Sequence, residues 1–299
     1  MTGHEPCVEG LLPYRPALHP RHHAGVPPQD SCVVIALKGA AVAMCARVDL
    51  RWFAGDPERT LRQLNNALGN VPEARIVLVG FGDPDDASIS VAELADALGW
   101  DRIADALISQ GDRYWVVPAT GAPIAFSFDR SALAAQAVFQ GIRIDATRAE
   151  AVLPVMVTEE VDPDLVARCR AAVAYIQPAV GFAVLRELAE SSEPLGVEEG
   201  LTLALLLGDE DRLGALATRL STDTAPVIWP NLVAARRFGP PETAPPVLAL
   251  LALASWLSGR GAAHVAALEE LTRIDARHPL AGVLSALHEQ GLPPDRWPL

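Results

Sequence analysis

The spacing of apolar residues changes character near the middle of this 299-residue chain. In the first part, short apolar runs of strand length alternate with segments in which apolar residues recur at the helical period. In the second part, nearly every segment has the helical period, and proline or glycine separates one segment from the next. The first pattern is typical of an α/β layer and the second predicts helices alone. We therefore predict a Pro/His-rich arm over 1–29, an α/β domain over 30–146 and a helical domain over 147–299.

The α/β domain is predicted to contain a mixed sheet built from a hairpin and a β-α-β unit. The runs SCVVIAL and AAVAMCARVDL flank Lys38-Gly39, which predicts the hairpin. Asp56 before Pro57 has the N-cap and first-turn signature of a helix, and this helix leads into the apolar strand ARIVLVGF. A second helix is predicted for SVAELADALGW, with Ser90 as its N-cap. The remaining predicted elements are the strands RIADALIS, RYWVV and PIAFSF and the short helix SALAAQAVFQG.

The helical domain is predicted to end in a tightly packed, tetratricopeptide-like hairpin. Counting back from Pro279, the residues Ile274, Leu271 and Ala267 have the spacing of the second helix of such a repeat. A solenoid needs about three repeats, and only one convincing unit is present, so we expect an irregular helical bundle. The segment TAPVIWPN fits either a strand or a helix.

The charge and hydropathy of the chain limit the kinds of partner it can bind and the cell compartment in which we expect it. The chain has 24 Lys and Arg against 37 Asp and Glu, a net charge of −13, which argues against nucleic acid as the main partner. The most apolar windows, LTLALLL and PPVLALLALASWL, are shorter than the ~20 residues that cross a bilayer, so we predict buried helices and no membrane partner. The first residues lack a signal-peptide pattern and the four cysteines lack disulfide spacing, which predicts a cytoplasmic protein. The sequence carries no signal for a particular oligomeric state.

Five polar residues are expected at one edge of the sheet. The strands that end at Asp49 and just before Asp83 should finish where the first hairpin strand begins, at Asp30 and Ser31. Arg47 shares a face with Asp49 by the two-residue period of a strand. Ligands of open α/β sheets commonly bind at such ends, so these residues are candidates for a pocket that takes a metal ion or a small cationic ligand. The alternative is that Arg47 pairs with a neighbouring aspartate while the others serve as turn and cap residues.

Other motifs give little support to a reaction. GFGDPDD lacks the third glycine and the Lys-Ser/Thr ending of a phosphate loop, so we interpret it as an acidic turn before a helix. HPRHH, at His19–His23, offers three imidazoles but no fourth ligand or rigid frame. Serine-hydrolase, zinc-protease, Walker and kinase signatures are absent from the sequence, and no cofactor or metal is expected.

A candidate partner surface lies in the helical domain. Trp229 and the pair Arg236-Arg237 could present an aromatic and cationic surface, with Trp256 covering the seam between two helices. The alternative is that Trp229 fills a gap between alanine-rich helices. These features favour a non-catalytic interaction or adaptor protein with a protein partner. The second hypothesis is an enzyme or a small-ligand or metal-binding protein that uses the acidic sheet edge.

Several blocks, in order, resemble the actinobacterial domain-of-unknown-function family 4192. They are AGVPPQDSCVVIALKG, ARVDL, ARIVLVGFGD, DALISQGDRYW, LAAQAVFQG and the long C-terminal block from PPVLALL to PPDRW. The resemblance extends from Ala24 to Trp297 and implies no particular activity. Many relatives place cysteines after the tryptophan that matches Trp115, whereas this chain has VVPATGAPIAF. The metal or redox role that such cysteines would suggest therefore does not carry over to this chain.

Overall fold

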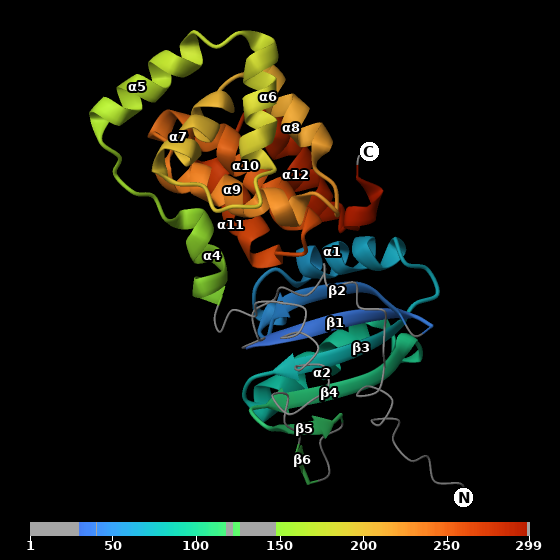
Figure 1. Ribbon diagram of the computed structural model, residues 1–299. Helices are drawn as coiled ribbons and strands as arrows, with labels where there is room; N and C mark the ends of the chain where they lie inside the picture. Colours follow the sequence, from blue (N-terminus) through green and yellow to red (C-terminus); the bar gives the residue numbers. More distant parts are fainter. Residues whose placement is uncertain (1–29, 40, 118–121, 126–147, 298–299) are drawn as a thin grey trace, which may run out of the picture. The chain divides into compact units, whose positions relative to one another are not determined.

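The computed structural model describes residues 30–39, 41–117, 122–125 and 148–297. The chain divides into two compact units, whose described parts lie within 30–125 and 148–297 (Figure 1). None of the described helices combines the length and apolar character that crossing a membrane requires. The predicted arm, the HPRHH motif, the helix SALAAQAVFQG and the predicted domain boundary all lie outside the described residues.

The first unit contains the predicted mixed sheet, with six strands in the order β2-β1-β3-β4-β5-β6. Strand β1 runs antiparallel to β2 and β3, β3 runs parallel to β4, and the last two pairings are antiparallel. Strands β2 and β3 therefore run in the same direction with β1 between them. The connection from β2 through α1 to β3 crosses over β1. In chain order the elements are β1 Ser31–Lys38, β2 Ala41–Asp49, η3 Trp52–Ala54, α1 Pro57–Gly69, β3 Arg75–Phe81, α2 Pro84–Leu98, η4 Trp100–Arg102, β4 Ile103–Gln110, β5 Arg113–Val116 and β6 Ile124–Ala125.

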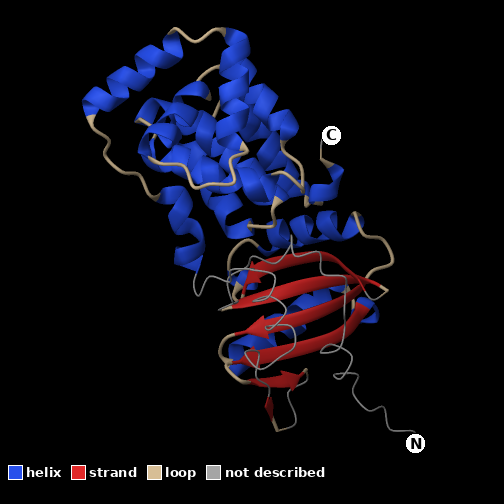
Figure 2. Cartoon of the chain, viewed as in Figure 1, coloured by secondary structure: helices blue, strands red, loops and turns tan. Residues whose placement is uncertain are grey.

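Helix α2 lies behind the sheet in Figure 2. Helix α1 packs against the same face, because the buried side chains of both helices belong to one core cluster. The buried side chains that join them are Cys32, Val34, Ala36, Ile76 and Leu78 from the strands and Leu64, Leu68, Val91 and Leu94 from the helices. The closest approach is at Gly80, where a Cβ atom would lie 2.9 Å from Val91 Cγ2. The start of α2 is thus fixed against the carboxyl end of β3.

Helix α2 begins earlier than the sequence pattern predicts. Its N-cap is Asp83, whose Oδ1 accepts hydrogen bonds from the backbone N–H groups of Asp85 (3.0 Å) and Asp86 (3.5 Å). Ser90, the predicted N-cap, is buried inside the helix. The Asp-Pro pair at 83–84 repeats the signal that starts α1 at Asp56-Pro57, and it outweighs the capping-box spacing at Ser90.

The second unit is helical throughout its described residues. TAPVIWPN belongs to a helix, with Pro230 inside α9. Helix α10 is apolar on every side and packs against α8, α9, α11 and α12, so that every side chain from Val247 to Ser255 is buried. The elements are α4 Arg148–Met156, α5 Pro163–Ala174, α6 Pro178–Ala189, α7 Val197–Leu206, α8 Glu210–Arg219, α9 Ala225–Phe238, η5 Pro241–Thr243, α10 Ala244–Leu257, α11 Gly261–Ile274, α12 Pro279–Gln290 and η6 Pro294–Arg296.

Candidate functional site

The strand register brings three of the expected edge positions together. Ser31 lies opposite Asp49 on one side and opposite Phe81 on the other. Asp30 precedes them with a positive φ of 44°, and its Oδ1 lies 3.0 Å from where a Cβ atom on Gly82 would be. Because Gly82 has a φ of 141°, in the region that favours glycine, this tight approach depends on the absence of a side chain.

The carboxylates at this edge are mostly engaged in local structure. Asp49 Oδ1 accepts a hydrogen bond from the Arg51 backbone N–H (2.8 Å), and Arg51 Nη2 pairs with Asp86 Oδ2 at 3.2 Å. Asp83 caps α2. These contacts are those expected of turn and cap residues rather than of a free set of ligands.

Two of the five edge residues line a hollow of about 430 Å³ beside α1. Its lining consists of Arg47, Val48, Asp49, Arg51, Trp52, Gly55, Asp56, Thr60 and Gln63. The charges are mixed, with two arginines and two aspartates. Among the described residues, no group of three or more His, Cys, Asp or Glu side chains is arranged to hold a metal ion.

The buried serine and cysteine on β1 do not form a nucleophilic site with any described neighbour. The Ser31 Oγ is buried without a hydrogen-bond partner, and no base is placed to activate it. Burial raises the pKa of the Cys32 thiol to about 12, so the thiol stays protonated at neutral pH.

The predicted partner surface around Trp229 is not displayed to solvent. Trp229 is only 8 % exposed, and its Nε1–H donates a hydrogen bond to Ser255 Oγ at 2.8 Å. The Arg260 guanidinium covers the ring, 4.2 Å from its centroid. Trp229 therefore fills the space between α9 and α10, which was the alternative interpretation, and it is not a surface residue. Trp256 is partly buried and meets Trp297 edge-on, with ring centroids 6.3 Å apart.

The adjacent arginines connect α9 to the end of α4. Arg236 Nε donates to the Val155 carbonyl at 3.3 Å, and burial lowers the pKa of this guanidinium. Arg237 forms an ion pair with Glu159, and its backbone carbonyl accepts a hydrogen bond from the Glu159 N–H at 2.7 Å. These contacts give both residues a structural role within the unit.

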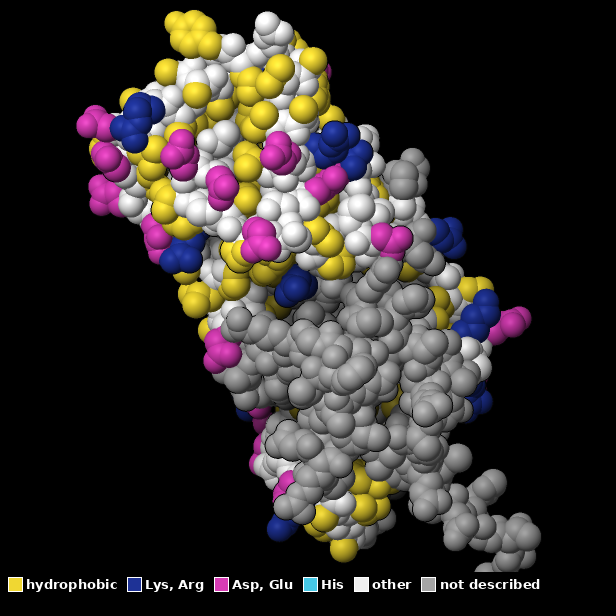
Figure 3. Space-filling view, in the orientation of Figure 1, with side chains coloured by type: hydrophobic (Ala, Val, Ile, Leu, Met, Phe, Trp, Pro, Cys, Tyr) yellow, Lys and Arg dark blue, Asp and Glu magenta, His cyan; other side chains and the backbone are white. Residues whose placement is uncertain are grey.

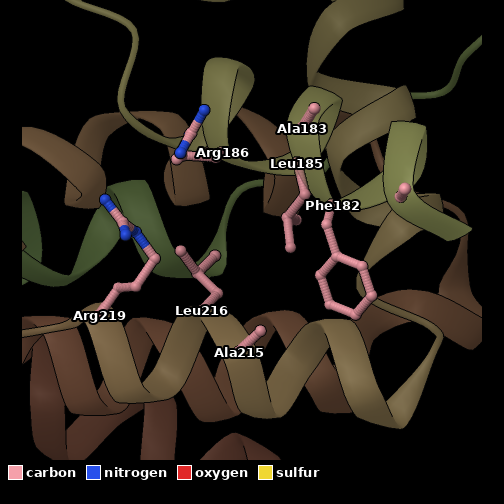
Figure 4. Close-up of a pocket in the computed structure, with 8 residues that line it drawn as sticks. Phe182, Ala183, Leu185, Arg186, Ala215, Leu216 and Arg219 are labelled. Atoms are coloured by element: carbon pink, nitrogen blue, oxygen red, sulfur yellow. The ribbon is translucent and has the colours of Figure 1, made fainter.

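A second hollow, of about 370 Å³, lies between α6 and α8 (Figure 4). Its lining consists of Ala179, Phe182, Ala183, Leu185, Arg186, Ala215, Leu216 and Arg219. Arg186 and Arg219 lie at one end, Phe182 lies at the other, and Leu185 and Leu216 lie between them (Figure 4). The hollow is therefore an apolar groove with a cationic end, and we call it the α6–α8 groove.

The first half of α6 is apolar on all sides, yet it is exposed. In the stretch PAVGFA, at 178–183, every residue except Gly181 is exposed, with Val180 at 49 % and Phe182 at 38 %. Tyr175, just before this helix, is 89 % exposed. Apolar side chains are gathered on the surface of the helical unit where α6 lies (Figure 3). A helix that is apolar on all sides is normally covered, so this surface lacks its expected neighbour among the described residues.

The two arginines of the groove differ in their partners. Arg219 donates to Glu190 Oε1 through both Nε (2.7 Å) and Nη2. Arg186 is exposed, and its guanidinium makes no hydrogen bond or ion pair with any residue in the described part of the chain. The spacing of apolar residues alone does not predict this groove, and the signal nearest to it in the sequence is an arginine that follows an apolar helix stretch.

The far end of α6 is fixed by a buried amide. Asn231 of α9 donates through Nδ2 to the carbonyls of Ala189 (3.0 Å) and Ser191 (2.9 Å). Near the other end, a Cβ atom on Gly181 would lie 3.1 Å from Arg212 Nε, so the glycine leaves room for the Arg212 side chain of α8. The two bonds from Asn231 fix the end of the groove wall that α6 forms.

The described residues thus define a protein with an α/β unit and a helical unit, in which an apolar groove is better formed than any catalytic arrangement. The chain belongs to the family described as Domain of unknown function (DUF4192), whose model matches residues 24–295. No curated protein and no solved structure matches the chain.

Proposed function

We propose that the protein is a non-catalytic interaction or adaptor protein whose helical unit binds a protein partner. The observation that carries this proposal is the exposed apolar surface formed by Tyr175 and the first half of α6. Contiguous apolar surface on a protein commonly marks an interaction site. Grooves between helices accept apolar side chains of partner helices.

The packing of α10 and α11 supports tetratricopeptide-like geometry as part of this proposal. The two helices are joined through Gly259, which has a φ of 72°, and Ala267 on α11 is fully buried. A small residue at that point lets helix axes approach closely. The free thiols of Cys32, Cys45 and Cys169 support a reducing compartment such as the cytoplasm.

A second candidate function is the binding of a small ligand at the sheet edge. The hollow that contains Arg47 and Asp49 favours it, because opposite charges on one face could recognise a zwitterionic or cationic molecule. It ranks second since the aspartates nearby already cap helices and turns.

One experiment separates the two functions. The full chain is used as bait in affinity purification, with a Tyr175→Asp/Val180→Asp double variant and an Asp49→Asn variant as comparisons. We expect a stoichiometric protein partner that the double variant loses and Asp49→Asn retains, with both variants melting at the wild-type temperature. In parallel, the wild type is screened by thermal shift with Mg²⁺, Mn²⁺, nucleotides and common metabolites, because a ligand of the native state raises its melting temperature. A shift that Asp49→Asn abolishes, together with a partner that the double variant retains, would overturn the interaction function in favour of ligand binding.

A further inference from the structure

We infer that the α6–α8 groove binds a helical, acidic segment of the protein partner, in which an apolar side chain enters the groove beside Phe182 and a carboxylate pairs with Arg186. This inference rests on the proposed function, since it assumes that the partner is a protein. It adds the place of contact and the chemistry of the segment that is recognised.

The apolar part of the groove has the shape that a side chain needs. Leu185 and Leu216 are buried and form its floor. The walls include the small side chains of Ala179, Ala183 and Ala215, which leave the space between them open. Its volume of about 370 Å³ is near the small end of the range for ligand sites, ~300–1,000 Å³. Such a space suits one or two inserted side chains and leaves the partner's backbone outside.

The cationic end determines the charge of the segment. Glu190 orients Arg219, whereas the guanidinium of Arg186 bonds to none of the described residues and is available to a ligand. A guanidinium matches a carboxylate through two parallel hydrogen bonds, and apolar neighbours strengthen such a pair by excluding water. Among the described residues, the Arg186 guanidinium has no acidic partner, whereas that of Arg219 has Glu190. This charge complementarity favours an acidic segment over a basic one.

The distance between the two ends of the groove determines the spacing in the segment. Phe182 and Arg186 are four residues apart on α6, a separation of ~6 Å along the axis at 1.5 Å per residue. An apolar residue and an Asp or Glu that are three or four positions apart on a partner helix have a similar separation. The segment therefore presents both groups from one face of a helix that lies along the groove.

The test begins with a display library of short helical peptides selected against the full chain. We expect selected peptides to carry an apolar residue followed or preceded by Asp or Glu at a spacing of three or four. Binding of the best peptide is then measured by isothermal titration calorimetry. Arg186→Glu and Phe182→Ala should each weaken binding roughly tenfold or more, as truncation of an interface anchor does. Phe182→Leu should retain most of the affinity.

Matched variants control for charge and for loss of apolar surface. Arg168→Glu makes the same charge change at an exposed arginine of α5, and Val227→Ala removes exposed apolar surface on α9. Both should leave the affinity within about twofold of the wild type, because rim and distant positions contribute little. Raised salt should weaken the wild-type complex more than the Arg186→Glu complex.

Several outcomes would overturn the inference. They are the selection of no peptide, selected peptides that lack the acidic and apolar pair, and equal binding by wild type and Arg186→Glu. Self-association that Arg186→Glu abolishes would show that a second copy of the chain occupies the groove. If Arg186→Glu and Phe182→Ala retain the captured partner while Tyr175→Asp/Val180→Asp loses it, the groove inference fails and the interaction function stands. If the double variant also retains the partner, both fail.

Discussion

Helix α10 and the first half of α6 have the same kind of sequence and opposite surroundings. Both are apolar on every side, yet α10 is enclosed by four other helices and α6 presents Val180 and Phe182 to solvent. The hydrophobic effect acts on both, since burying apolar surface is favourable wherever a neighbour exists to cover it. The difference shows that the sequence of an all-apolar helix indicates that the helix will be buried. It does not indicate whether the same chain or a partner buries it. In α10 the chain supplies the cover, and in α6 we propose that a partner does.

The largest expected effect comes from making a cavity in α10. Leu251→Ala removes a fully buried side chain from the centre of the helical core and should lower the free energy of unfolding by about 2–5 kcal/mol. Leu153→Ala makes the same change at an exposed position of α4 and should cost far less. Denaturant unfolding followed by circular dichroism measures both. Equal losses would mean that α10 is not the centre of the core.

The next effect depends on pH and concerns the helix that covers α10. His264 of α11 is buried and donates through Nδ1 to the Ala252 carbonyl at 2.8 Å, while burial lowers its pKa from 6.5 to about 4. The neutral ring is therefore favoured in the folded state, so its stability contribution is complete above pH 6.5 and is lost as the pH falls towards 4. The loss should be on the order of 3 kcal/mol, from 1.36 kcal/mol per unit of pKa shift.

A variant that does not titrate isolates this effect. His264→Asn keeps a donor near the Ala252 carbonyl without a group that titrates in this range. Chemical denaturation at several pH values should show a shallower loss of stability for the variant between pH 6.5 and 4. Parallel curves for the two proteins would assign the acid sensitivity to other groups.

A smaller effect is expected where α7 and α9 meet. A Cβ atom on Gly200 would lie 2.9 Å from the Ala234 carbonyl oxygen and 2.9 Å from Phe238 Cδ2, and the backbone cannot easily move away. Gly200→Ala should therefore cost about 1–3 kcal/mol through overpacking. Gly214→Ala, at a helix position with no atom within 4 Å, should instead stabilise by roughly 0.5–1 kcal/mol. Thermal melting of the pair tests the opposite signs.

The smallest effect is expected on α6 itself. Val180→Ser changes an exposed apolar residue and should alter the free energy of unfolding by less than about 0.5 kcal/mol. A cost as large as that of Leu251→Ala would show that α6 is covered within the free protein, and the comparison with α10 would then fail.

Much of the first unit could be predicted because its signals are local. The hairpin, the Asp56-Pro57 helix start and the apolar run of β3 each depend on neighbouring residues, and the structure contains all three. The sequence pattern misplaces the start of α2 because two capping signals compete within the same stretch, and only packing against Gly80 shows which one the helix uses. TAPVIWPN was ambiguous because Pro230 argues against a helix, while burial of Ile228 and Trp229 stabilises one.

The candidate site was harder to predict, since it depends on which surfaces remain uncovered. Trp229 has the composition of an interface residue, but Ser255 and Arg260 enclose it from distant parts of the sequence. Phe182 resembles a core residue in sequence, yet no described helix covers it fully. Both assignments require long-range contacts, which periodicity along one segment does not encode.

The amide of Asn231 has a consequence for how such a surface would work. By donating hydrogen bonds to two carbonyls at the end of α6, it fixes that end of the helix before a partner binds. A rigid receptor loses little freedom on association, so more of the contact energy is expressed as affinity. The groove would then be preorganised for binding, and most of the loss of conformational freedom would fall on the incoming chain.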